Sequence, residues 1–181
     1  KKDYGNDFAP SLLISPHGGK IIERVLQNVS QDELSSMKKL FVNEEVIMDA
    51  EQISIGSFSP LEGFMSYNYL KSVLDNMRLP NGIVWPLPII LQTKEISDFK
   101  VGDKILLVYE KDNVSYAILN LEEIYSPNKK EIVEKWFGTS DMEHPGVSDI
   151  LSSGDYFLAG NVDLIKSRES PYKIHELTPK Q

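Results

Sequence analysis

The chain has 181 residues, enough for one good-sized domain, and its 41% hydrophobic and 25% charged residues are ordinary values for a globular protein. Its formal net charge of −8 disfavours a general nucleic-acid binder, because Lys and Arg are the residues that hold a phosphate backbone. The sequence has no cysteine, which excludes disulfides, thiolate metal sites and a cysteine nucleophile and fits a reducing compartment.

The ends of the chain are more polar than its middle. We expect a flexible arm at residues 1–10, a domain at residues 11–170 and a linker at residues 171–181. Because the first residue is Lys rather than Met, we expect both ends to be boundaries within a longer protein. No apolar run approaches the length of a membrane span and no signal peptide is recognisable. We therefore expect a cytoplasmic protein with no membrane partner.

The first clear helix is predicted to begin at Ser30, because Ser30 and Glu33 have the spacing of a capping box. Its apolar positions recur at helical spacing and would form one buried stripe: Leu34, Met37, Leu40 and Phe41.

Residues 46–55 alternate loosely between apolar and polar side chains, which predicts a strand. On such a strand Asp49 and Glu51 would share one face. The pair could be a functional carboxylate pair, but a solvated edge is the more ordinary interpretation.

The stretch Gly56–Met65 places two glycines, two serines and one proline among four large apolar side chains. A solvated linker would not carry so many apolar residues. The stretch predicts a tight, partly buried corner that joins a helix to a sheet. A helix capped by Ser66 and running to about Met77 should follow.

The second half of the chain is richer in strand signals. Residues 83–91 are apolar but contain prolines at positions 86 and 88, which predicts a strand at an edge or a bulged corner. The best hairpin in the sequence joins residues 104–110 to residues 114–125.

A third helix is predicted with Ser126 as its cap, Pro127 at its first position and Gly138 after its end. Residues 155–165 form a late strand with a bulge or turn at Gly160. Short strands with about three inserted helices indicate an α+β fold around a mostly antiparallel sheet or barrel.

The residues show no convincing catalytic constellation. Phosphate-binding and nucleophile motifs are absent, and His17, His144 and His175 lie far apart, so we assign no catalytic, cofactor-binding or metal-binding residue. Asp141 could orient His144 for chemistry. A turn held by side-chain hydrogen bonds explains the same residues and is the preferred interpretation.

Several short segments, in this order and at these intervals, resemble the amino-terminal, PUA-like domain of ATP sulfurylases (sulfate adenylyltransferases). The resemblance covers about Ser11 to Gln181. It implies a PUA-like, mostly antiparallel β-barrel with about three inserted helices. Besides the corner, the segments are Pro16-His17-Gly18-Gly19, Leu79-Pro80-Asn81-Gly82, Trp85-Pro86-Leu87-Pro88-Ile89, Gly138-Thr139-Ser140-Asp141 and His144-Pro145-Gly146-Val147.

The resemblance implies that a longer parent enzyme joins ATP and sulfate to give adenosine 5′-phosphosulfate and pyrophosphate, with Mg²⁺. The family's nucleotide-binding segments, Gln-x-Arg-Asn-Pro-x-His-x-x-His and Gly-Arg-Asp-His, are absent here, whereas its Thr-Pro linker matches Thr178-Pro179. Two positions depart from the family pattern, at Asn128-Lys129 and at Ala159-Gly160-Asn161. We expect this chain alone to be inactive and to bind the catalytic domain of the same polypeptide. Assembly of the parent into a homo-oligomer is a further expectation.

The expected role is therefore structural, with three turns that carry few charges as candidate domain-interface segments. Packing within the domain is the alternative explanation for each of them. The candidate residues are His17, Gly18 and Gly19; Ser57, Phe58, Ser59, Pro60, Leu61, Gly63, Phe64 and Met65; and His144, Pro145, Gly146 and Val147.

Two other functions stay open from the sequence. One is a free-standing PUA-like module that binds RNA or another ligand, although the negative charge and the lack of a basic stripe disfavour RNA. The other is an independent small-molecule enzyme built on the cluster around His144.

Overall fold

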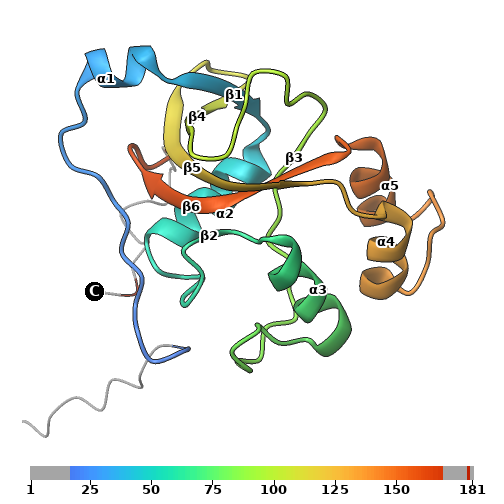
Figure 1. Ribbon diagram of the computed structural model, residues 1–181. Coiled ribbons are helices and arrows are strands. Elements are labelled where there is room, and N and C mark those ends of the chain that lie inside the picture. The colour runs from blue at the N-terminus through green and yellow to red at the C-terminus, as the bar shows by residue number, and fades with distance from the viewer. Residues whose placement is uncertain (1–16, 169–178, 180–181) are drawn as a thin grey trace, which may run out of the picture.

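The computed structural model describes residues 17–168 and residue 179 (Figure 1). The predicted arm at residues 1–10, the predicted linker except for residue 179, and His175 lie outside the described residues. Within them the elements are α1 (Gln31–Ser36), β1 (Lys38–Val42), α2 (Glu44–Ser54), β2 (Gly63–Phe64), α3 (Tyr67–Asn76), β3 (Gln92–Thr93), β4 (Lys104–Tyr109), β5 (Ser115–Tyr125), α4 (Lys129–Phe137), α5 (Pro145–Ser152) and β6 (Tyr156–Leu164).

All six strands belong to one sheet, in the order β1-β4-β5-β6-β2, with β3 also pairing with β6. β1 runs parallel to β4, and the other pairs are antiparallel. The expected barrel is not confirmed, because the sheet is mixed and does not close. Its free ends are β1 on one side and the short strands β2 and β3 on the other.

The sheet is buried on both faces around the β4–β5 hairpin. Figure 1 shows β5 and β6 running together across the molecule, with α2 against them and the α4–α5 pair at one end. Ile105 and Leu107 of β4 point into the main core, whereas Leu106 and Val108 join Leu34 of α1 in a second cluster. The predicted hairpin and late strand are confirmed.

Residues 44–54 form helix α2, so the predicted strand at residues 46–55 is wrong. Asn43 caps the helix, because its side-chain oxygen accepts a hydrogen bond from the Val46 amide at 3.1 Å. The fully buried positions, Ile47, Ala50 and Ile53, recur every three residues, as on a helix face. The alternating pattern would bury Met48 on the same strand face as Val46 and Ala50, but Met48 is exposed.

Helix α1 begins where it was predicted but covers only Gln31–Ser36. Ser30 is the cap residue but makes no side-chain capping bond, so the predicted capping box does not form. Near the end, Ser35 and Ser36 direct their hydroxyls back to helix carbonyls, which offers the backbone an alternative to continued helix. The predicted helical positions Leu40 and Phe41 lie in β1 instead.

The described residues contain five helices rather than about three. α3 is confirmed with its predicted cap, since Ser66 accepts from the Tyr69 amide at 3.3 Å. α4 begins later than predicted, because Asn128 and not Ser126 caps it. α5 was missed, since its first residues were interpreted as a turn. Residues 83–91 are extended, but beyond one isolated bridge at Val84 they form no strand.

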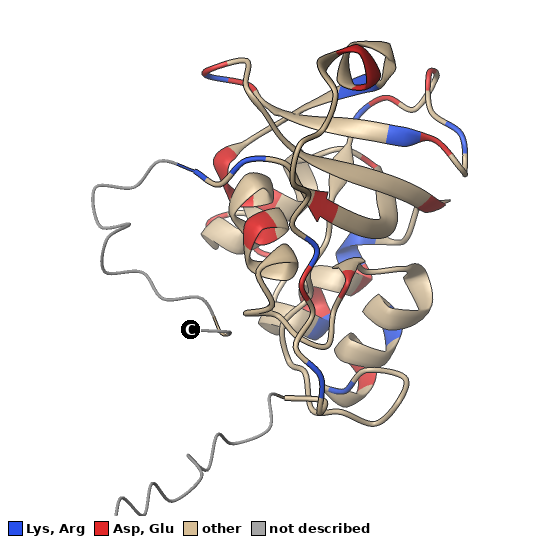
Figure 2. Ribbon diagram, turned by 90° about the vertical axis from the view of Figure 1, so that its left-hand side faces the viewer, with Lys and Arg blue, Asp and Glu red and all other residues tan. Residues whose placement is uncertain are grey.

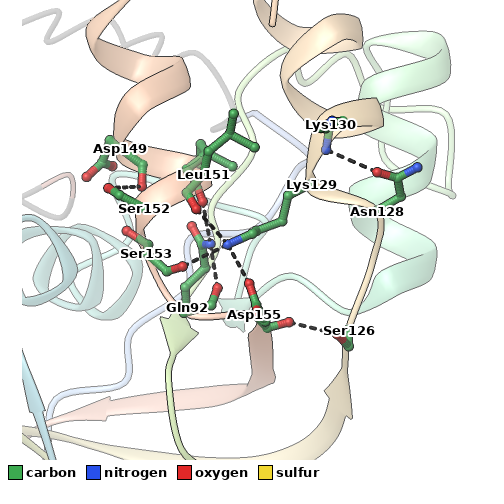
Figure 3. Close-up of polar contacts among 12 residues, drawn as sticks. Gln92, Ser126, Asn128, Lys129, Lys130, Asp149, Leu151, Ser152, Ser153 and Asp155 are labelled. Atoms are coloured by element: carbon green, nitrogen blue, oxygen red, sulfur yellow. Dashed lines mark hydrogen bonds and ion pairs between the residues drawn. The ribbon is translucent and has the colours of Figure 1, made fainter. Parts of the chain in front are cut away.

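Lys129 and Gln92 hold the carboxyl end of α5 against α4 and β3 (Figure 3). The Lys129 ammonium donates to the carbonyls of Leu151 at 2.9 Å and Ser153 at 2.8 Å, and lies 2.6 Å from an Asp155 carboxylate oxygen. The Gln92 amide donates to two further carbonyls of the same turn. A cation at this end also complements the helix dipole.

We predict that Lys129→Met lowers the free energy of unfolding by about 1–3 kcal/mol, because it leaves carbonyls of a partly buried helix end without their donor. Urea denaturation of the 181-residue chain measures this. The matched control is Lys130→Met, which changes an exposed lysine next to it and should cost no more than about 0.5 kcal/mol. Equal losses in the two variants would contradict the role given to Lys129.

Candidate functional site

The corner predicted at residues 56–65 is confirmed as a tight, partly buried connection. The buried Ser59 hydroxyl donates to the Gly56 carbonyl at 2.6 Å and accepts from the Ile22 amide at 2.9 Å. One side chain thus ties the turn to itself and to the incoming chain near residue 22.

Two contacts hold the corner, one to strand β5 of the sheet and one to the segment that precedes β3. The Tyr125 hydroxyl of β5 donates to the Met65 carbonyl at 2.8 Å, and the Met65 amide donates to the Ile89 carbonyl at 2.9 Å. Burial, with a smaller contribution from Glu123, raises the pKa of Tyr125, so its hydroxyl keeps its proton. Leu61, Phe64 and Met65 consequently lie in the main core rather than on the surface.

The first candidate segment, His17–Gly19, packs against this corner. A Cβ on Gly18 would lie 2.9 Å from the Pro60 side chain, which shows how close the two segments come. His17 Nε2 is 2.6 Å from the Val84 carbonyl, and its ring centroid is 6.2 Å from that of Trp85. Phe58 meets the same indole edge-on at 6.1 Å. Two of the three candidate segments therefore meet at Trp85.

The surface around Trp85 is apolar and exposed. Met77 is 66% exposed, Val84 49% and Leu87 44%, and residues 79–93 include no charged side chain. Two hydrogen bonds of Trp85 join these positions. Its backbone amide donates to the Met77 carbonyl, and its indole N–H donates to the Leu87 carbonyl. We call this surface the corner face and define it by the exposed residues His17, Gly18, Gly19, Ser57, Met77, Val84 and Leu87.

Met77, Val84 and Leu87 were not among the residues predicted for an interface. The uncharged run at residues 79–93 was a usable signal, but a strand in an apolar core would show the same pattern. Only the fold reveals that Val84 and Leu87 of this run stay exposed, whereas its other apolar residues, among them Leu79, Ile89 and Leu91, lie in the core.

A groove of about 500 Å³ lies beside the corner. Its lining includes the carboxylates of Glu62, Glu122 and Glu123, and Glu62 pairs with Arg24 at 3.2 Å. The apolar corner face thus borders an acidic groove.

The third candidate segment, His144–Val147, forms the first turn of α5. His144 Nδ1 accepts from the Val147 amide at 3.4 Å, and its ring lies 4.8 Å from that of Phe137 on α4. Asp141 accepts from the Glu143 amide at 3.0 Å. Packing within the α4–α5 pair accounts for these contacts.

A larger hollow, of about 720 Å³, lies where the sheet fails to close, and we call it the seam. Its walls are β1 residues 39–42, β3 and residues 94–99, and α2 contributes Val46 and Asp49. Burial, reinforced by repulsion from Glu45, raises the pKa of Asp49 to about 6. The predicted sharing of a strand face by Asp49 and Glu51 is wrong, because both residues lie on helix α2, where positions two apart do not face each other. Glu51 instead pairs with Arg168 at 2.9 Å.

Other kinds of site have little support in the described part of the chain. No group of three or more His, Asp and Glu side chains among residues 17–168 could hold a metal ion. No described helix is both long and apolar enough to cross a membrane. In the view of Figure 2 the basic residues are scattered over several segments and form no stripe.

We predict that Gly63→Ala destabilises the fold by at least about 3 kcal/mol, because the added Cβ would lie 1.8 Å from the Gly160 carbonyl oxygen across the β2–β6 pair. Thermal unfolding measures the loss. Gly19→Ala is the control, since no atom lies within 4 Å of its Cβ and only its φ of +82° opposes it, at about 1–2 kcal/mol. A smaller loss for Gly63→Ala than for Gly19→Ala would mean that β2 does not pair so closely.

We predict that Asp49→Asn stabilises the chain by about 1–3 kcal/mol at pH 8 and by almost nothing below pH 4. The pKa of Asp49 is raised from 3.8 to about 6 in the fold, so ionisation costs stability as the pH rises between these values. Urea unfolding at pH 4, 6 and 8 tests the trend, with Glu122→Gln as the control for loss of one charge. A stabilisation independent of pH would refute this account.

Comparison with known proteins shows the family and the relatives that the chain resembles. The family model described as a PUA-like domain matches residues 14–167. The sulfate adenylyltransferase of Thermococcus onnurineus is 34% identical over 172 residues, which are 93% of this chain and 45% of that protein. The sulfate adenylyltransferase of Aeropyrum pernix is 38% identical over 176 residues, again 93% of this chain and 45% of that protein. The chain thus spans less than half the length of these relatives.

Among solved structures, a hexameric APS kinase from Thiobacillus denitrificans has a TM-score of 0.68 at 22% identity, over 92% of this chain and 30% of that one. This likeness concerns the fold alone. The resemblance found in the sequence is confirmed by the matches to the relatives. The chain belongs to the PUA-like domain family.

Proposed function

We propose that this chain is the PUA-like, non-catalytic part of a sulfate adenylyltransferase, and that its corner face docks the catalytic part of the same polypeptide. The relatives named sulfate adenylyltransferase are more than twice as long as the matched region. In this proposal ATP, sulfate and Mg²⁺ bind to the remainder of the longer protein, in the cytoplasm. Assembly of the parent into a homo-oligomer belongs to the same proposal.

The exposed apolar residues around Trp85 carry the docking proposal. Met77, Val84 and Leu87 are exposed beside an uncharged run. Clustered apolar side chains on the surface of a globular protein indicate a contact with another domain or protein. Docking would bury these side chains, while the corner beneath them is already held rigidly by Ser59 and Tyr125. A rigid, apolar surface loses little entropy on binding and suits a permanent contact between domains.

An RNA-binding role has less support. The net charge is −8, and basic residues do not gather in the view of Figure 2. A role as an independent enzyme has no support from His144, whose ring nitrogen caps a helix.

The docking proposal predicts slower amide hydrogen exchange at residues 77–87 in the full-length protein than in the 181-residue chain, by at least about tenfold, because a docked domain excludes water. Residues 101–103, a turn on which Val101 is 60% exposed, are the internal control and should exchange equally in both proteins. Equal exchange of residues 77–87 in both would refute docking at this face.

A paired variant extends the test. Val84→Ser with Leu87→Ser should lower the melting temperature of the full-length protein but not that of the 181-residue chain, where both side chains are already exposed. Val101→Ser is the matched control. Sulfate-dependent release of pyrophosphate from ATP, expected for the full-length protein alone, tests the assigned activity separately.

A further inference from the structure

The seam lies between the two free ends of the open sheet. Within the part of the chain that the structure describes, β1 pairs only with β4, and β3 pairs only with β6. The hollow of about 720 Å³ between them is lined by residues 39–42 of β1 and by both residues of β3. It occupies the gap that would have to be bridged for the sheet to close.

The outer edge of β1 is available for pairing. Apart from the ladder with β4, residues 39–41 make no backbone hydrogen bond within the described part of the chain. Phe41 on this strand is 55% exposed. Unpaired amides and carbonyls along an edge strand are a template for one more strand.

The interior of the seam suits a segment with some apolar side chains. α2 presents Val46 to the hollow, the stretch before β3 presents Ile90, and α4 presents Trp136. A strand laid along the five residues of β1 would span about 17 Å and could direct alternate side chains toward these groups.

The charge around the seam selects a basic occupant. Two lysines, Lys39 and Lys94, face six carboxylates across the lining: Glu45, Asp49, Glu95, Asp98, Glu110 and Asp149. None of the six makes an ion pair with another described residue. Carboxylates that outnumber the neighbouring cations attract a cationic partner and steer its approach.

We propose that the seam binds an extended, Lys- or Arg-bearing segment of another polypeptide, which pairs with β1 as an added strand. A second copy of this chain fits poorly, because it carries a net charge of −8. The seam shares no residue with the corner face, so both surfaces can be occupied at once and neither proposal depends on the other.

The probe is a nine-residue peptide, acetylated and amidated, that alternates Lys or Arg with Val. Titrated into the ¹⁵N-labelled 181-residue chain, it should shift amide signals of residues 38–42 and 92–99. Cross-strand contacts between peptide amides and β1 amides should also appear. A peptide with Glu at every basic position should bind at least about tenfold more weakly. A peptide with every backbone amide N-methylated should not bind, because it can donate no ladder hydrogen bond to β1 from either edge.

Variants of the chain test the charges one by one. Asp49→Asn and Glu95→Gln should each weaken binding of the basic peptide about two- to fivefold, as expected for single exposed or half-buried charge pairs. Glu122→Gln removes a carboxylate outside the seam and should leave the affinity unchanged. No binding at 1 mM peptide, equal binding of the N-methylated peptide, or signal shifts confined to other surfaces would each overturn the proposal.

Discussion

The structure depends on the burial of the β4–β5 hairpin from both faces. Successive residues of β4 point to opposite sides of the sheet, yet Ile105, Leu106, Leu107 and Val108 are all buried. The sheet therefore needs a cover on each face, which α2 supplies on the main-core side and the short α1 on the other.

The two ends of the sheet differ in how the chain covers them. On the β2 side, the corner at residues 56–65 folds over the edge and is held by Ser59 and Tyr125, so the edge is protected by the protein's own chain. On the β1 side no segment of the described chain pairs with the outer edge of the strand, and the seam lies beside it. One end is thus held by the protein's own chain beside the groove of Glu62, Glu122 and Glu123, and the other is left open beside the acidic seam.

These contrasting surfaces suit partners of different kinds. The corner face presents exposed apolar side chains on a rigid base, which is typical of a permanent contact between domains. The seam presents carboxylates and unpaired backbone groups, which favour a charged, extended segment. Neither surface resembles a place where ATP and sulfate would react, since anion chemistry needs cations and donors that converge on one point. These surfaces therefore fit the proposal that catalysis belongs to another part of a longer protein.

Signals confined to a few neighbouring residues determined much of this fold from sequence alone. The cap at Ser66, the end of α4 at Gly138, the hairpin of β4 and β5, and the corner before Ser66 all depend on local geometry, and each is where it was predicted. The residues of helix α2 were predicted to form a strand because their apolar positions fit both the helical and the strand period. Only the exposure of Met48 in the structure distinguishes the two. The corner face and the seam were decided only by the tertiary structure. Both are made of residues distant in sequence, and which of their backbone and side-chain groups stay exposed depends on what else has packed beside them.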